Sequence, residues 1–171
     1  MGRIVTLVNR QSYREAMARF GAAVSIVTTD GPGGRFGFTA SAVTSVTDEP
    51  PTLLVCVNRR NESHPALLEN GVMCVSTLAA GQEDISGVFG GKEADQSARF
   101  AAGQWHTLAT GAPVLLGAVV AFDCRIVQIT EIGTHSVVFG EVVAIEHGAE
   151  HDGLVYFGRG YHRIRRPKLD E

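Results

Sequence analysis

Apolar residues along this chain recur at two spacings, one typical of a helix and the other typical of strands. From Tyr13 to Phe20 they return every three or four positions, which is the spacing of a single helix face. Ser12 stands just ahead of this stretch and Glu15 lies within it, at the spacing of a capping box. The pattern therefore predicts an amphipathic helix over residues 12–20.

Further along, short apolar runs are bounded by glycine, proline and acidic residues, the pattern of strands and turns. Pro51 has no backbone N–H for a sheet, so the strand near it is expected to begin after it. Ser63 is a candidate N-cap for a short helix that ends at Gly71, and helical turns are expected between residues 81 and 105. Strands are expected at 22–29, 36–46, 52–58, 72–78, 118–129, 135–146 and 153–157.

Residues 118–129 alternate most regularly. Alternation puts Phe122 and Cys124 on an apolar face of the expected strand, and Asp123 and Arg125 on the opposite, polar face. We therefore expect this strand to cover the core with one face and to contact water with the other.

The order of the expected elements indicates the fold class. The strands follow one another as hairpins, without regular alternation of strands and helices, which favours an antiparallel barrel over a doubly wound sheet. A length of 171 residues suits one well-buried core. We expect a mainly β fold with short helices in a single domain over residues 1–171, with its core at about 12–164 and a loose C-terminal tail.

Charge and composition argue against several classes of protein. The net charge is −3 at pH 7, and no basic stripe with interleaved aromatic residues is present, so we expect no nucleic-acid partner. Cys56, Cys74 and Cys124 lie in apolar runs without CxxC spacing, as expected for buried thiols in a reducing compartment. Because no run is long enough for a membrane span and the N-terminus lacks a signal-peptide core, we expect a cytoplasmic protein without membrane contact.

The stretch GFTASAVTSVTDEPPTLLVCVN, residues 37–58, is unusual because six hydroxyl side chains stand among small and apolar neighbours. A buried hydroxyl without a partner costs about 1–3 kcal/mol. On one continuous strand Thr39, Ser41 and Ser45 share a face, where they would suit a phosphate or a polyol chain, with Thr44 turned into the core. From the residues alone, a threonine-rich edge strand facing water explains the pattern at least as well.

Two further segments are candidates for ligand contact. The glycine pair in FGGK, Phe89–Lys92, allows backbone N–H groups to point at an anion, and Arg99 adds charge; a surface turn is the alternative. His135 follows a glycine turn between two long strands, where it would face a pocket mouth or serve only the structure.

Several familiar catalytic patterns are missing from the sequence. It has no G-x-G-x-x-G fingerprint after a strand, no Walker-type phosphate loop and no G-x-S-x-G elbow. It also lacks a cluster of histidine, cysteine and acidic residues at ligand spacing, so no metal site is expected. The residues alone thus indicate a β-barrel whose loops suit a phosphorylated ligand, and they do not name that ligand.

Several segments, taken together and in order, resemble one family. They are MARFGAAVSIVTTDG, GFTASAVTSVTDEPPTLLVCVN, NGVMCVSTLAAGQE, FGGK with ARF, IGTH and GLVYFGRGYHRI, within about residues 12–164. This set is similar to the small flavin reductases of two-component monooxygenases. Within that family it is most similar to the reductases of the pyrimidine-degradation and 4-hydroxyphenylacetate 3-monooxygenase systems.

The resemblance implies a fold and an activity. Members have an antiparallel split barrel that binds flavin, are usually homodimers, and transfer hydride from NADH or NADPH to FMN or FAD. The reduced flavin then serves a separate oxygenase. Alternatives on the same barrel are a flavoprotein that retains FMN and reduces another acceptor, such as a corrin cobalt, and a non-enzymatic flavin- or haem-binding module.

The resemblance also implies site residues by position. His135 corresponds to the histidine near the nicotinamide, where it would orient the carboxamide. Two adjacent arginines in NRRNESHP depart from some relatives and leave the choice between FMN and FAD open. The implied cofactor contacts are Gly37, Phe38, Thr39, Ala40, Ser41, Ala42, Ser45, Thr47, Asn58, Asn61, Ser63, His64, Phe89, Gly90, Gly91, Lys92, Arg99, Phe100, Tyr156, Arg159 and Tyr161.

Overall fold

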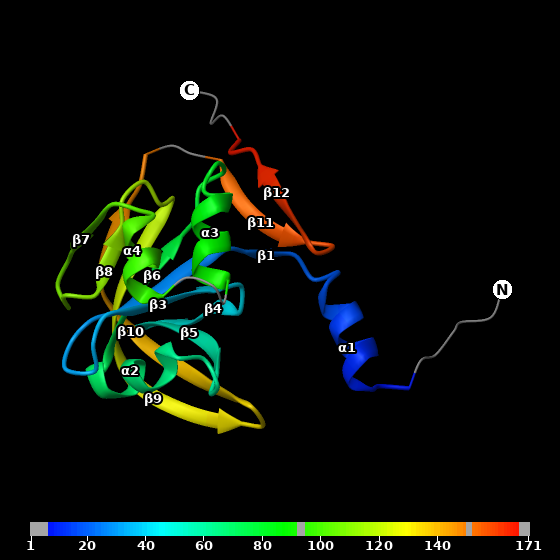
Figure 1. Cartoon of the computed structure of the whole chain (residues 1–171), viewed down its shortest axis with the longest axis horizontal. Helices are drawn as coiled ribbons and strands as arrows, with labels where there is room; N and C mark the ends of the chain where they lie inside the picture. The colour runs from blue at the N-terminus through cyan, green and yellow to red at the C-terminus, as the bar shows by residue number, and fades with distance from the viewer. Residues whose placement is uncertain (1–6, 92–94, 150–151, 168–171) are drawn as a thin grey trace.

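A computed structural model describes residues 7–91, 95–149 and 152–167 (Figure 1). The helices are α1 (Arg10–Met17), α2 (Ser63–Asn70), α3 (Glu83–Gly90) and α4 (Gln96–Ala101). The strands are β1 (Ala22–Ala23), β2 (Ser25–Thr29), β3 (Phe36–Ala40), β4 (Val43–Asp48), β5 (Pro51–Asn58), β6 (Val72–Thr77), β7 (Trp105–Thr107), β8 (Pro113–Leu115), β9 (Val120–Ile132), β10 (His135–His147), β11 (Gly153–Phe157) and β12 (Gly160–Ile164).

An antiparallel sheet forms the body of the protein. In the described residues it has seven strands in the order β3-β2-β6-β9-β10-β5-β4, while β1, β11 and β12 form a smaller sheet and β7 pairs with β8. The large sheet curls so that Phe38 of β3, at one edge, and Val55 of β5, next to the other edge, enter one apolar cluster. This arrangement confirms the predicted mainly β, antiparallel barrel with short helices.

A second apolar cluster fixes α3 and α4 beside strands β2 and β3. Phe89 of α3 and Phe100 of α4 pack edge to face with their ring centroids 5.4 Å apart, and Trp105 lies 5.0 Å from Phe100 and 5.5 Å from Phe89. Ile26 of β2 and Leu154 of β11 complete the same cluster. Burial of each such side chain contributes about 1.5–3 kcal/mol, which holds these short helices in place.

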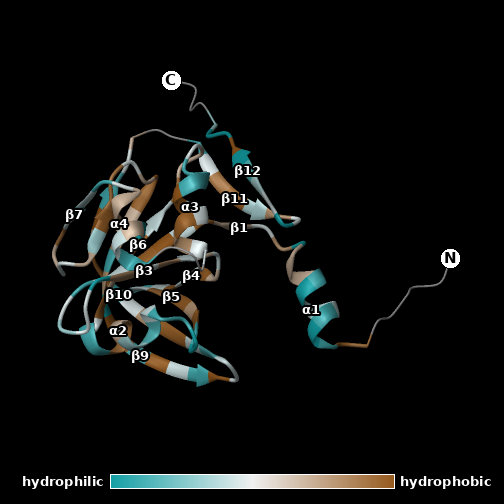
Figure 2. Cartoon of the chain, in the orientation of Figure 1, coloured by the Kyte–Doolittle hydropathy of each residue, from teal (hydrophilic) through white to brown (hydrophobic). Residues whose placement is uncertain are grey.

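The first helix begins earlier than predicted. Asn9 is its N-cap: the Asn9 side chain accepts from the Ser12 N–H, and the Asn9 N–H donates to the Ser12 hydroxyl, each at 2.9 Å. The prediction that Ser12 starts a helix over 12–20 was therefore wrong, because Ser12 is the reciprocal partner in a capping box three residues earlier. In Figures 1 and 2, α1 projects from the body and is mostly hydrophilic, whereas hydrophobic residues gather on the strands.

Two predicted strands are each divided in two. The strand expected at 22–29 breaks at Val24, and the strand expected at 36–46 breaks at residues 41–42. The second break exchanges the two faces of the chain, so Val43 packs on the core and Thr44 is exposed. Thr44 was predicted to face the core; that prediction assumed one unbroken strand and was wrong.

The strand near Pro51 also differs from the prediction. It begins at Pro51 itself, opposite Asp48 in the register, whereas a start after the proline was expected. Because Pro51 is at the first position of the strand, its missing N–H is tolerated there. At the other end of the barrel, the predicted helix that ends at Gly71 is confirmed, although its N-cap is Glu62 and not Ser63.

Asp123 is buried, contrary to the polar face predicted for it. Its side chain is fully enclosed and accepts hydrogen bonds from the backbone N–H, at 2.8 Å, and the hydroxyl of Thr110. The segment leading into β8 covers this outer face of β9, so both faces of the strand are enclosed at this point. Alternation in the sequence cannot reveal such a cover. Strand β12, which pairs with β11, was also not predicted.

Among the described residues, no helix is both long and apolar enough to cross a membrane.

Replacing Gly140 with alanine tests how tightly the barrel interior is packed. An added Cβ would lie 2.5 Å from Met73 Cε and 2.9 Å from Cys124 Cβ. We expect Gly140→Ala to lower the free energy of unfolding by about 1–3 kcal/mol, because overpacking forces neighbours to move. Gly87→Ala in α3, where no described atom lies within 4 Å of the added Cβ, should be neutral or stabilising by up to about 1 kcal/mol. Urea denaturation measures both, and a Gly140→Ala protein as stable as wild type would contradict this packing.

Candidate functional site

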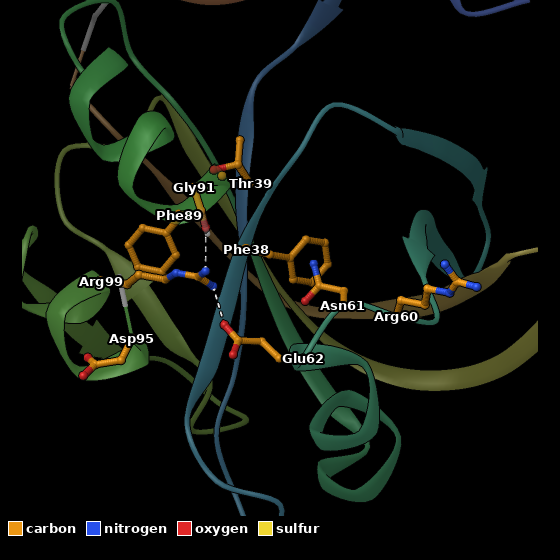
Figure 3. Close-up of a pocket in the computed structure, with 10 residues that line it drawn as sticks. Phe38, Thr39, Arg60, Asn61, Glu62, Phe89, Gly91, Asp95 and Arg99 are labelled. Atoms are coloured by element: carbon orange, nitrogen blue, oxygen red, sulfur yellow. Dashed lines mark hydrogen bonds and ion pairs between the residues drawn. The ribbon is translucent and has the colours of Figure 1, made fainter. Parts of the chain in front are cut away.

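A cavity of about 660 Å³ opens beside strand β3, between the loop that leads into α2 and the facing ends of α3 and α4 (Figure 3). Its size is that of a small-molecule or cofactor site. Glycine backbone, aromatic rings and charged groups share its surface. The residues that line it are Phe38, Thr39, Arg60, Asn61, Glu62, Phe89, Gly90, Gly91, Asp95 and Arg99.

Arg99 carries a buried charge at this cavity and is held by several hydrogen bonds. Its side chain is 7% exposed, and its Nη1 donates to the Gly37 carbonyl at 3.2 Å while Nη2 donates to the Gly91 carbonyl at 2.7 Å. Nη1 also lies 2.9 Å from Glu62 Oε1. Its buried Nε has no hydrogen-bond partner within the described part of the chain. The guanidinium thus holds β3 and the end of α3 together and retains one unused buried donor.

A ring of hydrogen bonds closes around this arginine. The Gly37 N–H donates to Gln96 Oε1 at 2.9 Å, and Gln96 Nε2 donates to Glu62 Oε1 at 2.6 Å. Glu62 Oε1 is therefore shared by Gln96 and Arg99. Helix α4, which carries both of these residues, starts at Asp95, whose carboxylate caps the helix by accepting from the Ala98 N–H at 2.8 Å.

Gly37 is packed too closely for any larger residue. A Cβ at this position would lie 2.7 Å from Phe89 Cε1. The absence of a side chain lets the Phe89 ring approach the backbone of β3, which brings the end of α3 against the cavity.

A second, smaller cavity adjoins the first at Thr39. It has a volume of about 200 Å³ and is lined by Val24, Thr39, Ser41, Ser86, Tyr156 and Tyr161. The Thr39 hydroxyl donates to the Ser86 carbonyl at 2.7 Å, and the Ser86 and Tyr161 hydroxyls lie 2.8 Å apart. Tyr156 and Tyr161 meet edge to face at 5.3 Å. The hydroxyl stretch therefore reaches both cavities: Thr39 lines both, and Ser41 lines the smaller one.

The loop after β5 contributes to the site in two ways. Asn61 lines the larger cavity, and its side chain accepts from the Ser63 N–H at 2.9 Å, while Asn58 accepts from the Arg60 N–H at 2.9 Å. Ser63 and His64 point inward. The Ser63 hydroxyl lies 3.4 Å from the Gly37 carbonyl, and His64 Nε2 lies 2.9 Å from the hydroxyl of Ser136 on β10. These two side chains support the cavity wall from behind.

Several other residues that were predicted to contact the cofactors line neither cavity. His135 is exposed at the start of β10, opposite Asn58 in the register, and its Nδ1 lies 2.9 Å from the Thr134 hydroxyl. Ser45 and Thr47 are exposed on β4. Neither cavity is lined by the buried Ala40, the buried Phe100, the exposed Ala42 or Arg159, which has a φ of 64° in the turn before β12. Lys92 lies outside the described residues.

Three residues of the larger cavity were not predicted as contacts, namely Arg60, Glu62 and Asp95, and in the smaller cavity Val24 and Ser86 were not predicted. The two adjacent arginines of NRRNESHP were a signal for the first, but only as unassigned charge. No local pattern marks the acids, which reach the cavity because segments distant in sequence meet there. Within the described residues, no group of three histidine, cysteine or acidic side chains is placed to hold a metal ion.

Comparison with known proteins agrees with this geometry. Residues 17–165 match the family model described as flavin reductase like domain. The chain belongs to the flavin reductase family. This flavin reductase is 63% identical over 157 residues to the Ancylobacter novellus protein named FMN reductase (NADH) RutF, covering 92% of this chain and 86% of that one. It is 57% identical over 159 residues to the Pantoea ananatis protein of the same name, covering 93% and 83%.

Solved structures show the same fold. BorF, the flavin reductase component of a bacterial two-component tryptophan halogenase, superposes on this flavin reductase with a TM-score of 0.86 at 30% identity, covering 93% of this chain and 100% of BorF. The Streptomyces globisporus NADH:FAD oxidoreductase SgcE6, solved with NAD and FAD fragments, also gives 0.86 at 30% identity, covering 97% and 100%. The predicted family, fold class and enzyme class, a NAD(P)H-dependent flavin reductase, are confirmed.

Replacing Arg99 tests whether its fork of donors holds the cavity together. We expect Arg99→Lys to lower the free energy of unfolding by about 1–3 kcal/mol, because an ammonium group cannot reach Gly37, Gly91 and Glu62 together. Arg14→Lys on the exposed surface of α1 is the control and should change stability by less than about 0.5 kcal/mol. Equal unfolding midpoints for the two variants in urea would refute a structural role for the Arg99 fork.

Proposed function

We propose that this flavin reductase transfers hydride from NADH to FMN and passes the reduced FMN to a separate oxygenase. The observation that carries the proposal is the cavity with Arg99 at its wall: it has the size of a cofactor site and contains a guanidinium. A phosphorylated ligand fits both features. The relatives named FMN reductase (NADH) support the choice of FMN and NADH over FAD and NADPH.

The two cavities suggest how the flavin lies. We assign the phosphate to the side with Arg99 and Gly91, where the guanidinium meets backbone groups. Thr39 lines both cavities and would contact the ribityl chain between them. The ring would then lie toward Ser41 and the tyrosine pair.

The remaining predicted contacts support these assignments or stay predictions. Gly37, Ser63, His64 and Phe100 act from behind the cavity surface. Contacts from Ala40, Ala42, Ser45, Thr47, Asn58, Lys92 and Arg159 remain predictions from the family resemblance.

The proposed chemistry needs no side-chain nucleophile. Bound flavin supplies a ring atom, N5, that accepts hydride from C4 of the nicotinamide. The chain's own residues therefore have to hold the two rings about 3–3.5 Å apart and keep water from between them. Hydroxyl and backbone donors near Thr39 and Ser41 would stabilise negative charge on the ring, and His135 would orient the nicotinamide carboxamide.

The proposal extends to the assembly and its setting. We expect a homodimer, because Val127, Ile129 and Ile132 of β9 and Val46 of β4 leave large apolar side chains exposed on the single chain. A second copy would cover such side chains. We further expect one domain and a cytoplasmic location, where NADH and a partner oxygenase are available.

Oxidation of NADH is the direct test of the activity. Mixed with NADH and FMN, the protein should lower the absorbance at 340 nm. The rate should be well above that of the same mixture without protein. Replacing FMN with FAD or riboflavin, and NADH with NADPH, ranks the substrates, and we expect NADH with FMN to be fastest. If no combination is oxidised, the proposed activity is wrong; retention of a coloured flavin through gel filtration would then favour a non-enzymatic flavin module.

His135→Ala tests the proposed nicotinamide contact. We expect kcat/KM for NADH to fall about tenfold, which corresponds to about 1.4 kcal/mol, with FMN affinity nearly unchanged. His147→Ala, at the other exposed end of the same strand, is the matched control and should behave as wild type. Identical NADH kinetics in the two variants would remove His135 from the site.

A further inference from the structure

We propose that Glu62 sets how tightly the flavin is held, by competing with the flavin phosphate for Arg99. The inference rests on the proposed function, in which FMN binds in this cavity as a substrate that must leave after reduction. It assigns to Glu62 a role opposite to that of a binding residue: its negative charge weakens the complex.

The geometry makes Glu62 the exchangeable partner of the arginine. Arg99 donates to the backbone carbonyls of Gly37 and Gly91, which belong to β3 and to the C-cap of α3 and do not depend on a side-chain rotamer. Glu62 instead reaches Arg99 Nη1, at 2.9 Å, with a side chain that is 52% exposed. Figure 3 shows this side chain entering the cavity from the loop before α2 toward the guanidinium.

Rotation of Glu62 leaves the surrounding fold in place. Glu62 is the N-cap residue of α2, but its side chain makes no capping hydrogen bond, so α2 does not depend on it. Besides Arg99, the carboxylate accepts from Gln96 Nε2 at 2.6 Å, and Gln96 keeps its bond from the Gly37 N–H when Glu62 leaves. A turn of the side chain toward water is therefore a local movement.

Charge decides the direction of the exchange. A phosphate group carries about −1.5 to −2 at neutral pH and offers three acceptor oxygens, whereas a carboxylate carries −1 and offers two. The phosphate can therefore take over Arg99, but it must first separate the ion pair and then lie near the displaced carboxylate. Asp95 also lines the cavity, and its negative charge adds to the repulsion, while the positive charge of Arg60 opposes it.

The consequence is specific to phosphorylated flavins. Riboflavin has no phosphate, so its binding does not require Arg99 to exchange partners. FMN binding does, and the affinity gained from its phosphate is reduced by the cost of displacing Glu62. A reductase that hands its product to another protein benefits from such a limit on affinity, because slow release would restrict turnover.

Glu62→Gln tests the competition. Glutamine keeps the shape of the side chain and an oxygen that accepts from Arg99 and Gln96, but it removes the charge. We expect it to bind FMN about fivefold to tenfold more tightly and to release FMN correspondingly more slowly. Its affinity for riboflavin should stay within about twofold of wild type. Quenching of flavin fluorescence gives both dissociation constants, and a stopped-flow chase gives the release rate.

Glu131→Gln is the matched control. Glu131 forms an ion pair with Arg59 at 2.8 Å outside the cavity, so this variant makes the same change of net charge without touching Arg99. It should leave the ratio of FMN to riboflavin affinity at its wild-type value. If both variants changed this ratio equally, the change of net charge alone would explain the effect, and the proposal would be overturned.

The remaining outcomes are also decisive. Unchanged or weaker FMN binding by Glu62→Gln, or tightening that is equal for FMN and riboflavin, overturns the competition while the proposed function stands. If wild-type protein binds neither flavin, the proposed function and this inference both fail. Binding is measured without NADH, so absence of NADH oxidation would affect the proposed function alone.

Discussion

The cavity depends on one buried guanidinium. Arg99 connects the backbone of β3, at Gly37, to the end of α3, at Gly91, and a charge this deep is tolerated only where such partners compensate for lost hydration. Hydrogen bonds to a charged group contribute about 1.5–3 kcal/mol each, as much as burial of an apolar side chain. On the core side, Phe89 of α3 and Phe100 of α4 pack against each other. Aromatic packing and the hydrogen bonds of Arg99 thus both hold α3 and α4 in place, and the position of these helices defines the cavity.

Much of the fold follows from local pattern, and the departures have local or long-range causes. Hairpin order and the position of Gly71 are readable because each reflects a few neighbouring residues. The face exchange that exposes Thr44 is not readable, since it depends on a two-residue break between β3 and β4. Burial of Asp123 depends on Thr110 and the segment leading into β8, which cover a face that alternation marks as polar.

The candidate site was predictable only where one segment carries it. Thr39 and Ser41 lie in a single hydroxyl stretch, and the glycine pair precedes Arg99 by a short interval, so sequence indicated both. Glu62 gave no signal, because its role arises from Arg99, which is distant in sequence but 2.9 Å away in the fold. Family resemblance supplied the identity of the ligand, a flavin, whereas the residue pattern indicated only a phosphorylated ligand. The same resemblance could not reveal a residue that opposes binding.

A crystal structure of the protein with FMN would test most directly whether the cavity held by Arg99 is the flavin site. A phosphate oxygen should lie about 2.7–3.2 Å from the Arg99 guanidinium, with Glu62 turned toward solvent and the ribityl chain beside Thr39. FMN bound elsewhere, or bound in the cavity with the Glu62–Arg99 ion pair intact and the phosphate pointing away from it, would contradict this account.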